Sequence, residues 1–141
     1  MVSVVFNMRE EIKMEMKLEL VPVPVSDVDR AKAFYVQQVG FKADHDVKPN
    51  DTVRVVQLTP PGSACSIVIS TGLPEISEMP PGAVKALNLV VSDIGNARRE
   101  LADRGVEVGE IKEYPQGIKY VHFSDPDGNS WVLQEMPLRK S

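Results

Sequence analysis

Short segments of alternating hydrophobic and polar residues run along most of the chain, and two amphipathic helical segments interrupt them. The first alternating segment, residues 18–25, predicts a strand. Ser26 or Asp27 then suits the N-cap of a helix, and Gly40 suits the position after its last turn. Between these limits, the apolar positions recur at helical spacing: Val28, Ala31, Phe34 and Tyr35.

The second half of the chain repeats this order of elements. Residues 84–91 predict a strand, and a helix carrying Ile94, Ala97 and Leu101 follows and closes at Gly105. Three more strands are predicted after each helix, at residues 41–47, 52–59 and 65–71 in the first half and 106–112, 118–123 and 130–136 in the second. Residues 72–82 contain three prolines and two glycines and form the predicted linker. Residues 125–129 predict a tight turn, so the last two strands form a hairpin.

Matching residues in the two halves lie at one fixed offset, which indicates a tandem duplication. The junction Val25-Ser26-Asp27-Val28 reappears 66 residues later as Val91-Ser92-Asp93-Ile94, and Ala31 matches Ala97 at the same offset. The predicted fold class is therefore α+β, with tandem βαβββ modules at residues 16–71 and 84–137 that form a curved mixed sheet around a cavity.

Length and composition fit one globular domain. The chain has 141 residues, of which 43% are hydrophobic and 26% charged. A net charge of -4 without any Lys/Arg cluster argues against a nucleic-acid partner. No apolar run approaches the roughly 20 residues that span a bilayer, so no membrane partner is expected. The single cysteine, Cys65, is interpreted as a small apolar strand residue, and we expect a cytoplasmic protein because nothing requires an oxidising compartment.

Residues 1–15 are expected to form an N-terminal extension outside the core fold. The segment lacks the apolar core and the cleavage site of a signal peptide. Two interpretations remain open, a leader without fixed structure and an arm that packs on a partner subunit.

Three motifs carry a family resemblance: the junction at Val25 with Ala33-Phe34-Tyr35 and Gly40-Phe41 after it, its repeat at Val91, and the turn Phe123-Ser124-Asp125-Pro126-Asp127-Gly128-Asn129-Ser130-Trp131. These motifs resemble those of the vicinal oxygen chelate superfamily, also called the glyoxalase/bleomycin-resistance/dioxygenase superfamily. The resemblance covers residues 16–137. It implies two modules that enclose a site for a small-molecule ligand, and it implies a homodimer, with or without exchange of modules between the subunits.

In metal-using members, the resemblance implies ligands on the first and last strands of each module. Counting from the matching junctions, these positions hold Leu20, Ala86, Val132 and Ser66. Three of them have no donor atom, and a lone hydroxyl is a poor ligand, so we expect no metal and no cofactor. Among the other donors, Glu19 and Glu135 point away from this face by strand alternation, and His45 and His122 are too few to rebuild a site.

The same alternation predicts which side chains line the cavity. If Ala86 and Val132 face inward, so do Asn88, Val90, Ser130, Gln134 and Met136. The predicted hairpin places Phe123 opposite Trp131 and His122 opposite Val132, which turns His122 and Tyr120 inward. In the first module, the inward positions are Leu20, Pro22, Pro24, Ser66 and Val68.

Each polar candidate has a structural alternative. Asn88 either contacts the ligand or bonds backbone at a sheet irregularity, and Gln134 near a strand end has the same two interpretations. His122, with Tyr120 beside it, is the best candidate for proton transfer, since imidazole titrates near neutrality. At least one of Arg54 and Gln57 is expected to be exposed, because they alternate with valines, and the alternative for Arg54 is recognition of an anionic ligand. Trp131 and Phe34 are predicted to be core residues.

Three functions agree with this pattern. The first is metal-free binding of a small, largely apolar molecule, which the apolar inner positions favour. The second is a metal-independent isomerase, cyclase or lyase acting on a carbonyl compound, with His122 and Tyr120 as acid and base. The third is a metal-dependent lyase or dioxygenase, which the missing ligands disfavour.

Overall fold

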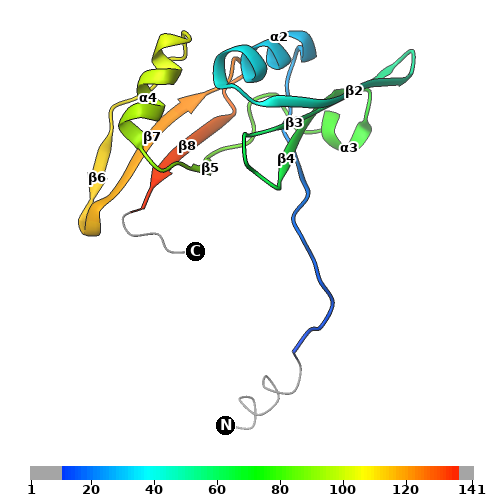
Figure 1. Ribbon diagram of the computed structural model, residues 1–141. Helices are drawn as coiled ribbons and strands as arrows, with labels where there is room; N and C mark the ends of the chain where they lie inside the picture. Colours follow the sequence, from blue (N-terminus) through cyan, green and yellow to red (C-terminus); the bar gives the residue numbers. More distant parts are fainter. Residues whose placement is uncertain (1–10, 137–141) are drawn as a thin grey trace.

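Two four-stranded mixed sheets lie side by side, as the computed structural model of the protein shows for residues 11–136 (Figure 1). The first sheet has the order β1-β4-β3-β2 and the second has the order β5-β8-β7-β6. The first sheet comprises β1 (Leu20–Pro22), β2 (Lys42–Asn50), β3 (Val53–Thr59) and β4 (Ser66–Thr71). The second comprises β5 (Leu87–Val90), β6 (Lys112–Tyr114), β7 (Ile118–Ser124) and β8 (Ser130–Glu135). The order of elements is the same in both halves, as the repeated sequence predicts.

One long helix lies on the same side of each sheet (Figure 1). In the first module, α2 (Val28–Ala33) continues as the π-helix η1 (Phe34–Val39), and in the second module the helix is α4 (Ile94–Asp103). Asp27 and Asp93 are the N-caps, each accepting a hydrogen bond from the backbone N–H three residues later. The two caps lie at the offset of the duplication. Of the two candidates for the first N-cap, Ser26 and Asp27, the structure uses Asp27. The linker contains a short helix, α3 (Pro74–Ser77), and β6 and β7 are joined by the 3-10 turn η2 (Pro115–Gly117).

Three predicted strands differ from the structure. The strand predicted at residues 18–25 is only Leu20–Pro22, because Pro22 and Pro24 lack the N–H groups of a longer ladder. The strand predicted at 84–91 starts at Leu87, since Ala86 has a φ of 61° and breaks the extended backbone. The strand predicted at 106–112 is wrong over residues 106–111, because this stretch is irregular and its backbone bonds to β7 where the N–H of Gly109 reaches the carbonyl of His122. Regular pairing begins at Lys112, where that prediction ended.

A single hydrophobic core fills the space between the helices and the sheets. Its centre is an aromatic cluster drawn from both modules: Phe34, Tyr35, Phe41, Phe123 and Trp131. Trp131 and Phe34 are 3% and 7% exposed, which confirms their prediction as core residues. Because module 1 supplies three of these rings and module 2 supplies two, neither module buries its apolar face without the other.

A buried polar network also joins the two modules. The Tyr35 hydroxyl donates to the Asp125 carboxylate at 2.8 Å and accepts from the indole N–H of Trp131 at 2.9 Å. The Asn129 amide donates both to Asp125 and to the carbonyl of Pro24, each at 2.8 Å. Burial and the nearby Asp125 charge raise the pKa of Tyr35 far above its usual range, so its hydroxyl stays a neutral donor. The turn at 125–129 therefore acts as a connector between modules as well as a hairpin turn.

The described residues end at 136, so residues 1–10 of the predicted N-terminal extension and the last residue of the predicted second module lie outside them. Among residues 11–136, no helix has the length and hydrophobicity needed to cross a lipid bilayer.

Candidate functional site

Each sheet has one face covered by a helix and one face without a helix, which we call its open face. In the first sheet, Val56, Leu58, Ile67 and Ile69 are at most 4% exposed and pack into the core beneath α2. Strand alternation then places their neighbours on the open face: Leu20, Pro22, Val55, Gln57, Ser66, Val68 and Ser70. In the second sheet, Val121, Phe123, Trp131 and Leu133 point into the core, so the side chains between them form the second open face.

Two rows of side chains cross the second open face. Asn88 on β5, Val132 on β8 and His122 on β7 are direct neighbours in the first row. Val90, Gln134 and Tyr120 follow in the second row, two residues further along. The predicted pairings of His122 with Val132 and of Phe123 with Trp131 are confirmed. Val132 is buried at the centre of its row, whereas Asn88 and His122 are exposed on either side of it.

Asn88 bonds to backbone at a sheet irregularity, which is the structural alternative considered from the sequence. Its side-chain amide donates to the carbonyl of Ala86 at 2.9 Å, next to the positive φ of Ala86. The N–H of Ala86 in turn donates to the Ser130 hydroxyl at 2.8 Å, which ties the start of β5 to β8. One N–H of the Asn88 amide is thus engaged, and the side chain as a whole is exposed.

Tyr120 and Gln134 form the more apolar end of this face. The Tyr120 ring packs edge-on against Tyr114 of β6, with ring centroids 5.3 Å apart. The Gln134 amide donates to the sulfur of Met136. These contacts leave a half-buried surface of aromatic rings, a methionine and one amide, a composition typical of a site for a small apolar ligand.

On the first open face, Ser66 belongs to a polar chain that sequence reasoning did not identify. Its hydroxyl lies 2.6 Å from the Thr59 hydroxyl and accepts from the Gln57 amide at 3.2 Å, and Thr59 also donates to Asp44. Finding this chain required the register of three strands, since Gln57 and Thr59 come from β3 and Asp44 from β2. Leu20 is the direct neighbour of Ser66 across the β1–β4 pair and is 38% exposed.

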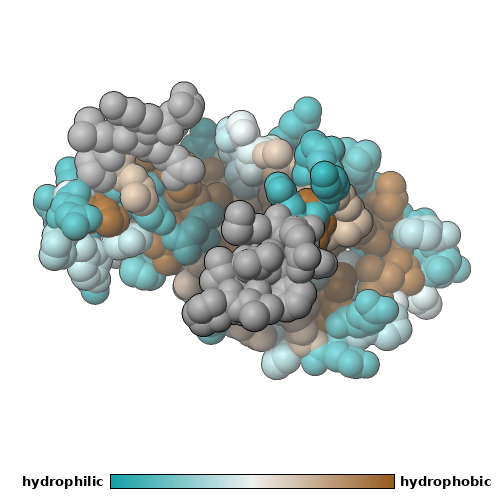
Figure 2. All heavy atoms as spheres, turned by 90° about the horizontal axis from the view of Figure 1, so that it is seen from below, coloured by the Kyte–Doolittle hydropathy of each residue, from teal (hydrophilic) through white to brown (hydrophobic). Residues whose placement is uncertain are grey.

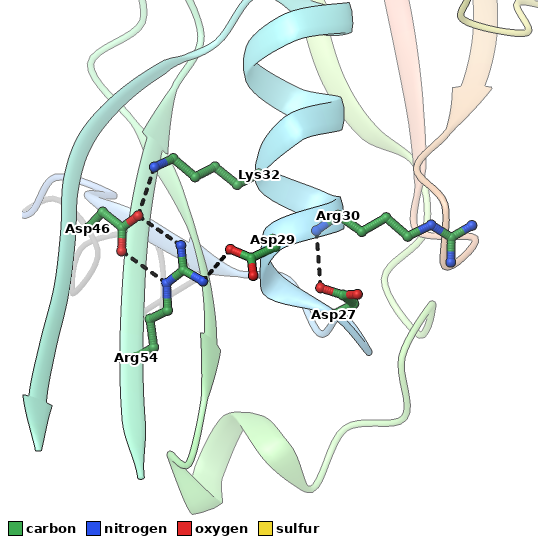
Figure 3. A network of polar contacts seen from close by, with 6 residues as sticks. All are labelled: Asp27, Asp29, Arg30, Lys32, Asp46 and Arg54. Carbon is green, nitrogen blue, oxygen red and sulfur yellow. Dashed lines mark hydrogen bonds and ion pairs between the residues drawn. The ribbon is translucent and has the colours of Figure 1, made fainter. Parts of the chain in front are cut away.

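Arg54 lies on the helix-covered face of the first sheet, apart from the other candidates. Its guanidinium donates to Asp46 at 3.0 and 2.9 Å and to Asp29 of α2 at 2.6 Å, and Lys32 of α2 donates to Asp46 at 2.7 Å (Figure 3). Its hydrogen bonds to the two carboxylates, Asp46 first, raise the pKa of Arg54, and the same bonds with Arg54 and Lys32 hold the pKa of Asp46 well below its usual range. This network attaches α2 to β2 and β3, and it holds the Arg54 guanidinium on the helix-covered face, away from the open face.

The four positions at which the resemblance places metal ligands do not fit a divalent ion. Leu20, Ala86 and Val132 offer only carbon, and the Ser66 hydroxyl is occupied by Thr59 and Gln57. Glu135 lies on the opposite face of β8 from Val132. It accepts a hydrogen bond from the N–H of Ile94 at 2.6 Å, at the start of α4. Among residues 11–136, no group of three or more His, Cys, Asp or Glu side chains converges.

The open faces and residues 11–19 together hold most of the exposed large hydrophobic side chains between residues 11 and 136. Of the ten large hydrophobic side chains that are exposed between residues 11 and 136, nine lie on the open faces or on residues 11–19. On or just beyond the open faces are Leu20, Val47, Val90, Tyr114 and Met136, each 37 to 53% exposed. Seen from below, hydrophobic residues reach the surface over both halves of the molecule, beside hydrophilic ones (Figure 2). Such a concentration marks a surface that meets a ligand or another protein.

Three grooves in the described part of the chain lie beside the open faces. A groove of about 340 Å³ separates α4 from the end of η1, and one of about 160 Å³ lies between β4 and the linker. A shallow groove of about 890 Å³ runs along β7 and is bordered by His122, Arg30 and Glu107. None of these three grooves has open-face residues from both sheets.

Comparison with known proteins agrees with this architecture. Residues 17–133 match the family model described as the Glyoxalase/Bleomycin resistance protein/Dioxygenase superfamily. The uncharacterized protein YetH of Bacillus subtilis (strain 168) is 31% identical over 119 residues, which are 82% of this chain and 94% of YetH.

Solved structures of this superfamily have the same fold. The antibiotic binding protein TnmS3 from Streptomyces sp. CB03234 is 36% identical, with a TM-score of 0.76 over 89% of this chain and 99% of its own. A glyoxalase/bleomycin resistance protein from the same organism is 39% identical, with a TM-score of 0.70 over 83% and 98% of the two chains. A superfamily member from Sphaerobacter thermophilus DSM 20745 is 32% identical, with a TM-score of 0.74 over 86% and 98%. The chain therefore belongs to the glyoxalase/bleomycin resistance protein/dioxygenase superfamily.

Proposed function

We propose that the protein binds a small, largely apolar molecule on its open faces, without a metal ion, and does so in the cytoplasm. The observation that carries this proposal is the second open face, where Val90, Val132 and Tyr120 lie beside two polar groups, Asn88 and His122. Apolar walls supply affinity, and a few placed polar groups orient the ligand. The free thiol of Cys65 suits a reducing compartment.

We propose that a second copy of the chain completes the site, as a homodimer. One open face alone leaves a ligand half in water, whereas small-ligand sites bury most of the ligand surface. A partner would also cover the exposed apolar side chains of Leu20, Val47, Val90 and Tyr114. The site would then lie between the open face of one protomer and an open face of its partner.

The superfamily relatives support binding as the activity. TnmS3, at 36% identity, is described as an antibiotic binding protein. An apolar antibiotic with a rigid ring system would suit the tyrosines and valines of the second open face, since aromatic rings contribute large contact areas.

A charge placed on the open face tests this proposal. Val90→Glu, at a position 53% exposed, should weaken the binding of 8-anilinonaphthalene-1-sulfonate and of apolar antibiotics at least about tenfold, because the carboxylate stays hydrated. Ile111→Glu is the matched control, since Ile111 is 41% exposed outside the two rows. Titration by fluorescence and calorimetry measures both. Equal affinity of the two variants, or no binding by the native chain across an antibiotic panel, would reject the proposed site.

A metal-independent isomerase, cyclase or lyase is the second candidate function. It is favoured by the placement of His122 and Tyr120 two residues apart on one face of β7, within reach of one ligand. His122→Asn keeps a polar group of similar size and should abolish turnover of a carbonyl substrate while binding persists. Unchanged turnover in this variant would remove His122 as the acid or base.

A further inference from the structure

Residues 11–19, which lead into β1, alternate strictly between charged and apolar side chains. Glu11, Lys13, Glu15, Lys17 and Glu19 occupy the odd positions, and Ile12, Met14, Met16 and Leu18 occupy the even ones. A period of two over nine residues is the pattern of a strand with one apolar face and one hydrated face. We call residues 11–19 the arm.

Within the described part of the chain, the arm runs away from β1 as an extended segment with a bend at Met14, and no strand lies beside it (Figure 1). Its even side chains are 64 to 74% exposed, the highest values among the large hydrophobic residues between 11 and 136. Between residues 11 and 136, the arm makes one backbone hydrogen bond. It lies at the end next to β1, where the Glu19 carbonyl accepts from the N–H of Ser66 at 2.9 Å. An apolar stripe on an unpaired strand is a surface suited to pairing with another chain.

The backbone of β1 shows on which side such pairing would occur. The odd residues turn their N–H and C=O groups toward β4, as the bonds of Glu19 to Ser66 and of Val23 to Val68 show. Successive residues of a strand point these groups to opposite edges, so those of Leu20 and of the even arm residues point to the free edge. That edge continues the edge of the first sheet, because β1 is an end strand in the order β1-β4-β3-β2.

We propose that the arm pairs antiparallel with the arm of a second copy of the chain, about a twofold axis at Met16. This register places Lys13 opposite Glu19 and Glu15 opposite Lys17 on the hydrated face. On the apolar face it places Met14 opposite Leu18 and Ile12 opposite Leu20. Every cross-strand pair from residue 12 to 20 is then apolar with apolar or acidic with basic, and such pairs stabilise a sheet.

The charge pattern rejects the neighbouring arrangements. A twofold axis at Glu15 would put Glu11 opposite Glu19 and Lys13 opposite Lys17, and a parallel in-register pair would put every charge opposite itself. Like charges directly opposite destabilise a sheet. An axis at Met14 would bring Glu10 of the sequence opposite Leu18, which sets a charge in the apolar stripe.

The arm pair would also extend the proposed site. The even side chains of the arm share their parity with Leu20 and Pro22, which lie on the first open face. The paired arms would therefore add Met14, Met16 and Leu18 to the apolar surface around the ligand, and methionine adapts its shape to different partners. The pairing itself goes beyond the proposed function and does not need a ligand to occur.

Cysteine cross-linking of the full-length chain in a Cys65→Ser background tests the register. Met16→Cys should form a disulfide-linked dimer under a mild oxidant, because only residue 16 meets its own copy, at about 5.5 Å between Cα atoms. Met14→Cys alone should not cross-link, since its copies would be about 13 Å apart along the ribbon. A mixture of Met14→Cys and Leu18→Cys chains should cross-link. Cross-linking of Met14→Cys alone, or none by Met16→Cys, would overturn the register.

A charge swap gives a readout without cysteine. Lys17→Glu should weaken dimerisation at least about tenfold, as measured by sedimentation equilibrium, because it sets Glu15 opposite an acidic residue. The double variant Glu15→Lys with Lys17→Glu should restore the dimer. A dimer that is unaffected by Lys17→Glu would overturn the arm pairing while leaving the completion of the site by a second copy intact, and a chain that stays monomeric would overturn both.

Discussion

Individual residues in this chain separate into those that hold the fold and those that remain available for a ligand. Asn129, Asp125 and Tyr35 use their polar atoms on one another or on backbone, in a buried network. His122 and Tyr120 lie on an open face, and neither has such a network around it among the described residues. Residue type alone does not make this distinction, because Tyr35 and Tyr120 have the same chemistry and differ only in surroundings.

Removing the Tyr35 hydroxyl is expected to destabilise the protein. In Tyr35→Phe, the buried Asp125 carboxylate loses a donor and the Trp131 indole N–H loses its acceptor, at a cost of about 1–3 kcal/mol. Urea unfolding followed by far-UV circular dichroism measures the change. Tyr114→Phe is the control, since Tyr114 is 48% exposed and should change the free energy of unfolding by less than about 0.5 kcal/mol. Equal effects in the two variants would contradict the network.

The charge network around Asp46 is expected to make stability fall in acid. Its pKa in the folded protein lies below the value in the unfolded chain, so the contribution is present above the unfolded pKa and is lost as the pH falls below it. Asp46→Asn should cost about 1 kcal/mol at neutral pH and should flatten the acid limb of the stability curve. Unfolding at a series of pH values checks this. A native and a variant curve that run parallel below pH 5 would contradict the shift.

At the scale of elements, the repeated motif predicts local structure well and strand length poorly. Asp27 and Asp93 cap equivalent helices because a carboxylate before a helical stretch satisfies free N–H groups through local geometry alone. The extent of β1 and β5 depends on which backbone groups face a neighbour, and the strand predicted at 106–112 failed because regular pairing with β7 starts only at Lys112. Hydrophobic alternation reports which face is buried, and pairing decides where a strand begins.

The N-caps offer a matched pair of predictions. Asp27→Ala and Asp93→Ala should each lower the free energy of unfolding by about 1 kcal/mol, because each leaves an N–H in the first helical turn without its acceptor. Ser92→Ala, beside the second cap and exposed, is the control and should change little. Thermal unfolding of the three variants measures the differences. An effect confined to one cap would show that the two junctions differ in role.

At the scale of the whole molecule, the two modules form one body with one core and two open faces. Phe41 packs on Trp131, and Asn129 bonds to Pro24, so the contact between modules is made on the helix side. This arrangement leaves the open faces directed away from the shared core. The ligand site that we propose is therefore a property of an assembly, and neither module contains it alone.

Purified protein is expected to carry far less than one equivalent of Mn, Fe, Co, Ni or Zn. The positions that would hold an ion contain Leu20, Ala86 and Val132, and Ser66 uses its hydroxyl within the sheet. Elemental analysis by mass spectrometry, before and after incubation with each metal and dialysis, checks this. One tightly bound ion per chain would contradict it and would favour a metal-dependent reaction.

The sequence by itself determined the duplication, the places where the two long helices begin, the parity of β5, β7 and β8, and the lack of a donor atom at three of the four ligand positions. These are local properties, since spacing along the chain sets which side a residue faces. Only the tertiary structure decided that Arg54 lies under α2 with Asp46 and that Ser66 is joined to Gln57 and Thr59. Those outcomes depend on register and on the packing of one module against the other, and both arise from contacts between residues far apart in sequence.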